Sequence, residues 1–256
     1  MNKHRVVLIA LGLLSAPVVV AAQAKQGPPV PVATQPATAP VETSEQATRK
    51  ALTKILPEVN LSGVPLIEAI DYFREATGQN FYVEWNALRA VTISQNARVT
   101  YKAEKISAAD ALTNALKPID DGAHKITYGI LGKTVIVSTP ESLRDVLGTA
   151  RGDLYKANDP EARKILMREL PSVNFKRTPF RDAVDVLRDT SGATINVDWQ
   201  SIVTAGISRD TPVTLKLNAI PFKEALRLLL LDVGGTVPLD FTIENSVVSV
   251  FVPNPL

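Results

Sequence analysis

The hydrophobic pattern of the chain switches between strand and helix periodicity, and the same series of segments occurs twice. Residues 59–64 and 173–178 alternate apolar and polar positions, as half-buried strands do. Pro65 and Pro179 follow, and proline is favoured in the first turn of a helix, where its missing N–H costs nothing. The next apolar residues have helical spacing: Leu66, Ile67, Ala69, Ile70, Phe73 and Ala76, and in the second series Phe180, Ala183, Val184, Val186 and Leu187.

Glycine and hairpin residues mark where these elements end. Gly78 and Gly192 directly follow the two helices, as expected for a left-handed C-terminal cap. The pattern then predicts strands at 80–85 and 194–199, strands at 98–103 and 212–217, helices at 107–116 and 221–231, and closing strand pairs at 125–130 with 134–138 and 240–244 with 247–252. The order is β-α-β-β-α-β-β in both series, which predicts an α+β fold.

A fixed offset of 114 residues relates the two series. It pairs Leu56 with Leu170, Pro65 with Pro179, Ala69 with Ala183, Gly78 with Gly192, Trp85 with Trp199, Val99 with Val213 and Leu112 with Leu226. Near the end it slips by one, so that Val135 matches Val248. We therefore expect two tandem domains of one fold, at 44–140 and 158–256, joined by a partly helical linker at 141–157.

The first 24 residues have the parts of a secretory signal. Lys3 and Arg5 give a positive start, an apolar run follows, and Ala22-Gln23-Ala24 has the small-x-small pattern of a cleavage site. The alternative is an uncleaved membrane anchor, but a spanning helix needs about 20 apolar residues and Pro17 interrupts this run. Residues 25–43 are rich in proline and predict a disordered tether.

Charge and cysteine content narrow the class of protein. Of 28 Lys and Arg, two leave with the signal, so 26 remain against 26 Asp and Glu. A balanced mature chain gives no support to binding of nucleic acid, and the rest of the sequence predicts no transmembrane segment. The absence of cysteine excludes disulfides, thiol catalysis and cysteine metal sites, so apolar burial must hold an exported fold together.

Two stretches of the second series resemble a known family. Residues 173–187 and 211–226 are similar to the secretin and TonB short N-terminal domain: a strand, a small residue with proline, an amphipathic helix ending at glycine, then an apolar strand. The first series is more diverged, with Ser107 and Ala108 where Pro221 and Phe222 stand. The resemblance implies a periplasmic recruitment or signalling module, as found before secretin pores and in outer-membrane transporters.

Candidate catalytic residues are few. His124 is the one histidine of the mature chain, in a predicted turn, and no nucleophile motif accompanies it. Glu84 and Asp198 occupy matching positions before the tryptophans, but we expect them to face outward from strands rather than to act as a glycosidase pair. Gly234-Gly235 lacks the pattern of a phosphate loop and predicts a turn. We predict no enzyme, no catalytic residue, no metal site and no cofactor.

Trp85 and Trp199 have two interpretations. Their matched places favour core packing, and the alternative is a stacking platform for a ligand in a groove between the copies. The sequence thus predicts a non-catalytic interaction module of the periplasm or cell envelope, whose partner is an envelope protein of a secretion, pilus or transport assembly. A periplasmic small-ligand or cell-wall glycan-binding protein is the alternative, and a hydrolase acting through His124 or an acid pair is the third reading.

Overall fold

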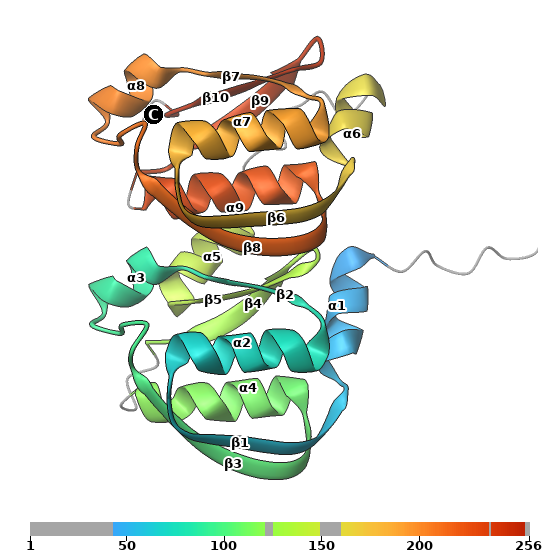
Figure 1. The fold of residues 1–256 in the computed structure, drawn as a ribbon, viewed down its shortest axis with the longest axis vertical. Coiled ribbons are helices and arrows are strands. Elements are labelled where there is room, and N and C mark those ends of the chain that lie inside the picture. Colours follow the sequence, from blue (N-terminus) through green and yellow to red (C-terminus); the bar gives the residue numbers. More distant parts are fainter. Residues whose placement is uncertain (1–42, 121–124, 149–159, 236, 254–256) are drawn as a thin grey trace, which may run out of the picture. The chain divides into compact units, whose positions relative to one another are not determined.

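A computed structural model describes residues 43–120, 125–148, 160–235 and 237–253, which lie in one compact unit, Val41–Leu256 (Figure 1). It is a mixed fold of helices and small sheets, in agreement with the predicted α+β class. The predicted signal peptide, the Pro-rich segment up to residue 42, His124 and residues 149–157 of the predicted linker lie outside the described residues. Among the described helices, none combines the length and the apolar character that a membrane crossing requires.

The elements divide into an N-terminal half and a C-terminal half that follow the same order. The N-terminal half contains α1 (Ser44–Leu52), β1 (Ile55–Pro65), α2 (Leu66–Thr77), β2 (Asn80–Val83), α3 (Trp85–Ala90), β3 (Arg98–Ser107), α4 (Ala108–Leu116), the 3-10 turn η1 (Lys117–Ile119), β4 (Thr127–Leu131) and β5 (Thr134–Ser138). After α5 (Pro140–Gly148), the C-terminal half contains α6 (Pro160–Leu166), β6 (Glu169–Pro179), α7 (Phe180–Ser191), β7 (Thr194–Val197), α8 (Trp199–Thr204), β8 (Pro212–Pro221), α9 (Phe222–Gly234), β9 (Asp240–Glu244) and β10 (Val247–Phe251).

Each half has three layers, with two helices between a two-stranded and a three-stranded sheet (Figure 1). In the N-terminal half β1 pairs antiparallel with β3, while β2 runs parallel to β5 and β4 antiparallel to it. In the C-terminal half β6 pairs with β8, and the second sheet has the order β7-β10-β9. The helices bury their apolar stripes between the layers, including Phe73 on α2 and Phe180 on α7.

The long strands share a register irregularity at matching places. The pairing shifts between Ser62 and Val64 in β1 and between Lys176 and Thr178 in β6. Gly63 has a φ of 65° and Arg177 a φ of 55° at the intervening position. Such a β-bulge bends a strand and increases its twist, which lets the two-stranded sheet curve over the helices.

Several predicted boundaries differ from the structure. The first strand of each half begins earlier, at Ile55 and Glu169, because it pairs with β3 or β8 over its whole length. The helices start one residue after Pro65 and Pro179, which stand at the N-cap. Pro160 is the first residue of α6, where the missing N–H of proline costs nothing.

The tryptophans do not end the second strands. Trp85 and Trp199 are the first residues of α3 and α8, two short helices in segments that the sequence pattern indicated as loops. In the C-terminal half the reason is a cap: Asp198 accepts a hydrogen bond from Ser201 N at 3.1 Å and turns the chain from strand to helix.

The halves are joined by side chains that cross between them. The apolar core of the C-terminal half includes Tyr82, Ile136 and Leu143 from the preceding elements. The Asn80 side chain pairs with the main chain of Asn218 on β8, donating to its carbonyl oxygen at 2.9 Å and accepting from its N–H at 2.8 Å. Thus the side-chain amide of the first residue of β2 satisfies the backbone groups of Asn218 that do not pair with β6.

The β4–β5 turn is a second crossing point. Lys133 N donates to Glu224 Oε1 at 2.9 Å and Oε2 at 3.2 Å, so the carboxylate on α9 lies directly against the turn. Gly132 has a φ of 54°, and a Cβ built on it would lie 1.2 Å from Glu224 Oε1. The close approach of the two halves therefore needs a glycine at this position.

We expect Gly132→Ala to lower the free energy of unfolding by about 2–4 kcal/mol, because the methyl group displaces the buried Glu224 carboxylate and the left-handed φ disfavours alanine. Chemical denaturation of the purified chain measures the effect. Gly148→Ala is the matched control, since a Cβ there meets nothing within 4 Å. Equal stability of both variants would show that the turn does not contact α9.

Candidate functional site

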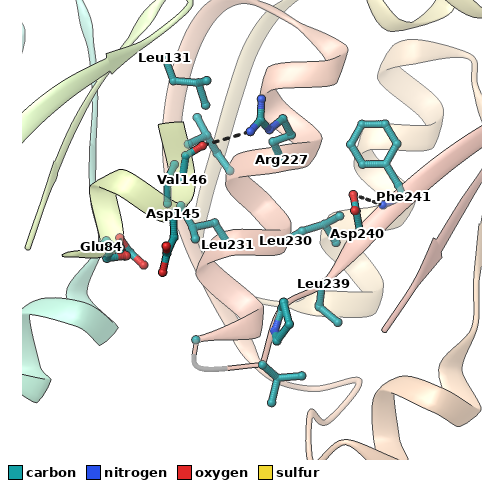
Figure 2. Close-up of a pocket in the computed structure, with 15 residues that line it drawn as sticks. Glu84, Leu131, Asp145, Val146, Arg227, Leu230, Leu231, Leu239, Asp240 and Phe241 are labelled. Atoms are coloured by element: carbon teal, nitrogen blue, oxygen red, sulfur yellow. Dashed lines mark hydrogen bonds between the residues drawn. The ribbon is translucent and has the colours of Figure 1, made fainter. Parts of the chain in front are cut away.

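A pocket of about 360 Å³ lies between elements of the two halves (Figure 2). Its volume is in the range of roughly 300–1,000 Å³ that is usual for small-molecule sites. The N-terminal half and α5 supply Glu84, Leu131, Ser142, Asp145 and Val146, and α9, β9 and the segment joining them supply Arg227, Leu228, Leu230, Leu231, Gly235, Val237, Pro238, Leu239, Asp240 and Phe241. Most of these side chains are apolar, and the charged groups are few.

Glu84 is the most buried of the polar groups that line the pocket, with an exposed fraction of 4%. It follows β2, its N–H donates to the Val137 carbonyl oxygen at 2.9 Å, and it precedes α3. The hydroxyls of Ser138 and Ser142 both donate to its Oε2 at 2.6 Å. These two bonds fix the orientation of the carboxylate, and no group of the described residues donates to Oε1.

The other charged groups of the pocket come from both halves. Asp240, at the start of β9, is 8% exposed, and its Oδ1 accepts the N–H of Phe241 at 2.8 Å. The guanidinium of Arg227 donates to the carbonyl oxygen of Val146 at 3.2 Å, across the junction between α9 and α5 (Figure 2). Asp145 lies beside Glu84 in this view, whereas Asp240 lies on the far side of Leu230 and Leu231. The pocket is thus lined by three carboxylates and one guanidinium.

Two further acids lie at the contact between the halves. Burial raises the pKa of Glu224 to about 7, although the Lys133 N–H and the charges of Lys133, Arg227 and Lys223 act in the opposite direction. Burial also raises the pKa of Asp232 to about 6, against the hydrogen bonds from Thr214 N and the Tyr82 hydroxyl and the charge of Arg89. The pKa of Tyr82 is raised well above its ordinary value by burial and by Asp232.

The structure corrects the expectation for the two matched acids. Glu84 was expected to face outward, but it is buried because α5, which has no counterpart after β10 among the described residues, supplies Ser142 and covers it. Asp198 is exposed and caps α8. Glu84 is therefore a buried hydrogen-bond acceptor and Asp198 an exposed helix cap, so the two carboxylates are not an acid pair.

The tryptophans are partly buried and pack against apolar cores. Trp199 meets Phe180 edge to face at a centroid distance of 5.1 Å, and Arg209 lies over its ring at 5.2 Å. Trp85 packs against the core of the N-terminal half. Neither residue lines the pocket between the halves, so a groove there walled by tryptophan, one of the alternatives from the sequence, does not describe this pocket.

The remaining candidates divide between turns and undescribed residues. Gly235 has a φ of 57° and follows the end of α9, which fits the predicted turn at Gly234-Gly235. Within the described ranges no group of three His, Asp or Glu side chains has the arrangement to hold a metal ion. His124 lies outside those ranges.

The sequence analysis did not predict the contact between the halves. A signal of it is present at positions related by the offset, where one half has an apolar residue and the other a polar one. Tyr82 and Ile136 are buried, whereas their counterparts Asn196 and Ser249 are polar and at least partly exposed. On the facing surface, Leu228 and Leu231 correspond to Asn114 and Lys117. Apolar residues occur at these positions only in the half where they meet the other half. Such one-sided differences between matched positions of the two halves are the signal of an internal interface.

Comparisons with known proteins returned no matching family model, no matching curated protein and no matching solved structure. The resemblance to the secretin and TonB short N-terminal domain therefore stays a prediction.

We expect the free energy of unfolding to fall by on the order of 2 kcal/mol as the pH rises from 5 to 8. The pKa values of Glu224 and Asp232 in the folded protein, about 7 and 6, exceed the ordinary values of 4.5 and 3.8. The stability that these two groups contribute is thus fully present below the ordinary pKa values and is lost as the pH rises through 6 to 7. Urea denaturation at a series of pH values measures this slope.

Glu224→Gln should flatten part of this slope and leave the part due to Asp232, since the neutral amide oxygen still accepts from Lys133 N. Glu244→Gln, on an exposed residue at the end of β9, is the control and should keep the wild-type slope. A wild-type protein with equal stability at pH 5 and pH 8 would contradict the assignment.

Proposed function

We propose that this protein is an exported, non-catalytic interaction module of the cell envelope, built from two tandem copies of a domain resembling the secretin and TonB short N-terminal domain. The copies are the N-terminal and C-terminal halves, at 44–140 and 158–256. The proposal is supported by the equal order and pairing of their elements. Its partner is an envelope protein, for example of a secretion, pilus or transport assembly.

The open outer edge of β3 is the observation that carries the proposal. On β8 the matching edge is occupied, because the main-chain N–H and C=O of Asn218 bond to Asn80. Glu104 is the counterpart of Asn218 at the offset of 114 and has the equivalent pairing, opposite Glu58 as Asn218 is opposite Ser172. Among the described strands β3 pairs with β1 alone, so its main chain at Glu104 is open to a partner.

The chemistry of this edge suits a specific rather than an indiscriminate partner. Lys102, Glu104 and Lys105 are exposed on β3. Charged side chains on an edge strand discourage pairing between copies of the same edge. An extended segment with complementary charges can still add to such an edge through main-chain hydrogen bonds, as in β-strand addition.

Glu104→Pro tests the edge, because proline removes the outward N–H and is tolerated on an edge strand. We expect the mature wild-type chain to capture an envelope protein from a membrane and periplasm extract at physiological salt. Glu104→Ala should capture it equally, and Glu104→Pro should lose it at least about tenfold while melting within a few degrees of wild type. Capture of nothing by the wild type, or equal capture by Glu104→Pro, would count against the proposal.

Export is the second part of the proposal, and it rests on the pattern of residues 1–24. We expect the mature protein to begin at Lys25, because cleavage follows Ala22-Gln23-Ala24. Intact-mass measurement of the protein purified from its native envelope decides this. Recovery of a chain that still contains the first 24 residues, in the membrane fraction, would show instead that the segment is retained as an anchor.

The pocket favours a second candidate function, that of a small-ligand binding protein. The small-ligand candidate depends on residues other than those of the β3 edge. An experiment can therefore contradict one of the two proposed functions and leave the other standing. Glu84 and the leucines of α9 line the pocket, whereas Glu104 does not.

A further inference from the structure

We propose that a second copy of this chain occupies the open edge of β3, so that two N-terminal halves pair their β3 strands antiparallel about a two-fold axis at Ala103. This inference rests on the open edge in the proposed function and names one occupant of it, which an envelope partner then has to displace. Three features of the N-terminal half support the pairing: the unblocked edge, the order of the charges on β3 and the charges beside it on α4.

The edge of β8 is blocked at two places, and neither block has an equivalent among the residues described around β3. A side chain of the N-terminal half bonds to the main chain of Asn218, and Oδ2 of Asp232 on α9 accepts the N–H of Thr214 at 3.0 Å. Thr100 is the counterpart of Thr214, but the position of Asp232 is taken by Pro118, which has no carboxylate. Within the described part of the chain, the edge of β3 therefore lacks both contacts that occupy the edge of β8.

The main-chain groups of every second residue on β3 point away from β1. The pairing of Glu104 with β1 matches that of Asn218 with β6, and Asn218 turns its N–H and C=O outward. Because an antiparallel ladder alternates from residue to residue, Lys102 and Thr100 also turn these groups outward. Three residues of this edge can thus bond to the main chain of an added strand.

The charges on this edge are self-complementary in one register. When Ala103 lies opposite Ala103 of the second copy, each Lys102 lies opposite a Glu104, and opposite charges across two strands stabilise their pairing. Moving the centre of the pairing to Lys102 or to Glu104 places two like charges opposite each other, which is destabilising. Charges on the edge therefore disfavour the neighbouring registers, as edge charges usually do, and select a single one.

This order of charges occurs on the open edge and is absent from the blocked one. The counterparts of Lys102 and Glu104 on β8 are Lys216 and Asn218. A base followed two residues later by an acid is thus found on the strand that can accept a second copy.

The helix beside β3 has a stripe of the same kind. Asp110 and Asn114 on α4 and Lys117 directly after it have the spacing of one helix face, and Asp110 and Lys117 are exposed. Their counterparts on α9 lie at the contact with the N-terminal half, as the edge of β8 does, so this stripe lies on the side of the β3 edge. A two-fold axis reverses α4 together with β3 and turns the acidic end of one stripe towards the basic end of the other.

Sedimentation equilibrium of the mature full chain over a concentration series tests the proposal. The contact is isologous and closes with two copies, so we expect a monomer–dimer equilibrium. Lys102→Glu and Glu104→Lys should each weaken the dimer at least about tenfold, because the two-fold symmetry turns both opposite-charge pairs into like-charge pairs. Lys216→Glu, at the exposed counterpart of Lys102 on β8, is the matched control and should keep the wild-type dimer.

Mixing the two single variants decides the register. Lys102→Glu leaves two acids on the edge and Glu104→Lys leaves two bases, so the mixture should dimerise as tightly as the wild type although each variant alone does not. Circular dichroism checks that both exposed substitutions leave the chain folded. A mixture that associates no more tightly than its components would overturn the proposal, as would single variants that dimerise like the wild type or a wild type that is still monomeric at about 1 mM.

Capture from the envelope extract separates this inference from the proposed function. A wild-type chain that captures its partner but does not dimerise overturns the second copy as an occupant of the edge and leaves the interaction module standing. A chain that dimerises but captures nothing contradicts the interaction module alone. Dimerisation of Glu104→Pro at wild-type strength would place the contact elsewhere than on β3 and overturn the inference, because proline removes the outward N–H.

Discussion

Burial of one face of the β2-β5-β4 sheet against the C-terminal half determines much of the remaining structure. Tyr82 and Ile136 on this face join the core of the other half and are 4% and 0% exposed. Because buried polar groups need partners, the surroundings of this face supply them: Asn80 bonds to Asn218, Lys133 N to Glu224, and Tyr82 to Asp232. The pocket lies at the same junction, where α5 and α9 do not fill the space between them.

The elements that local pattern predicted well are those with strong local signals. The closing strands Thr134–Ser138 and Asp240–Glu244 have the predicted bounds, and their partners β4 and β10 differ from the predicted bounds by one or two residues, because the hairpin residues locate the turn between the strands of each pair. Gly78 and Gly192 end α2 and α7 in the left-handed conformation, with φ values of 70° and 64°. The short helices α3 and α8 were missed because six residues contain too little periodicity to be recognised.

The candidate site was much harder to predict, because its residues come together only through the contact of the halves. Glu84 looked like the counterpart of Asp198, yet its surroundings depend on Ser142 in a helix between the two halves. Leu231 lies in helix α9 and Asp240 begins strand β9, and nothing in the local pattern of either element marks these residues as part of a pocket. Pairing of this kind is set by tertiary packing, which leaves no fixed spacing in the sequence.

The contact between the halves joins unlike surfaces, and this has a consequence for assembly. A heterologous, head-to-tail contact between similar units would normally propagate into a ring or an open fibre. Here the positions of the C-terminal half that match Tyr82 and Ile136 are Asn196 and Ser249, and those of the N-terminal half that match Leu228 and Leu231 are Asn114 and Lys117. The polar residues at these matching positions lack the apolar surface that the contact between the halves uses, as the outer faces of terminal repeats do in repeat proteins.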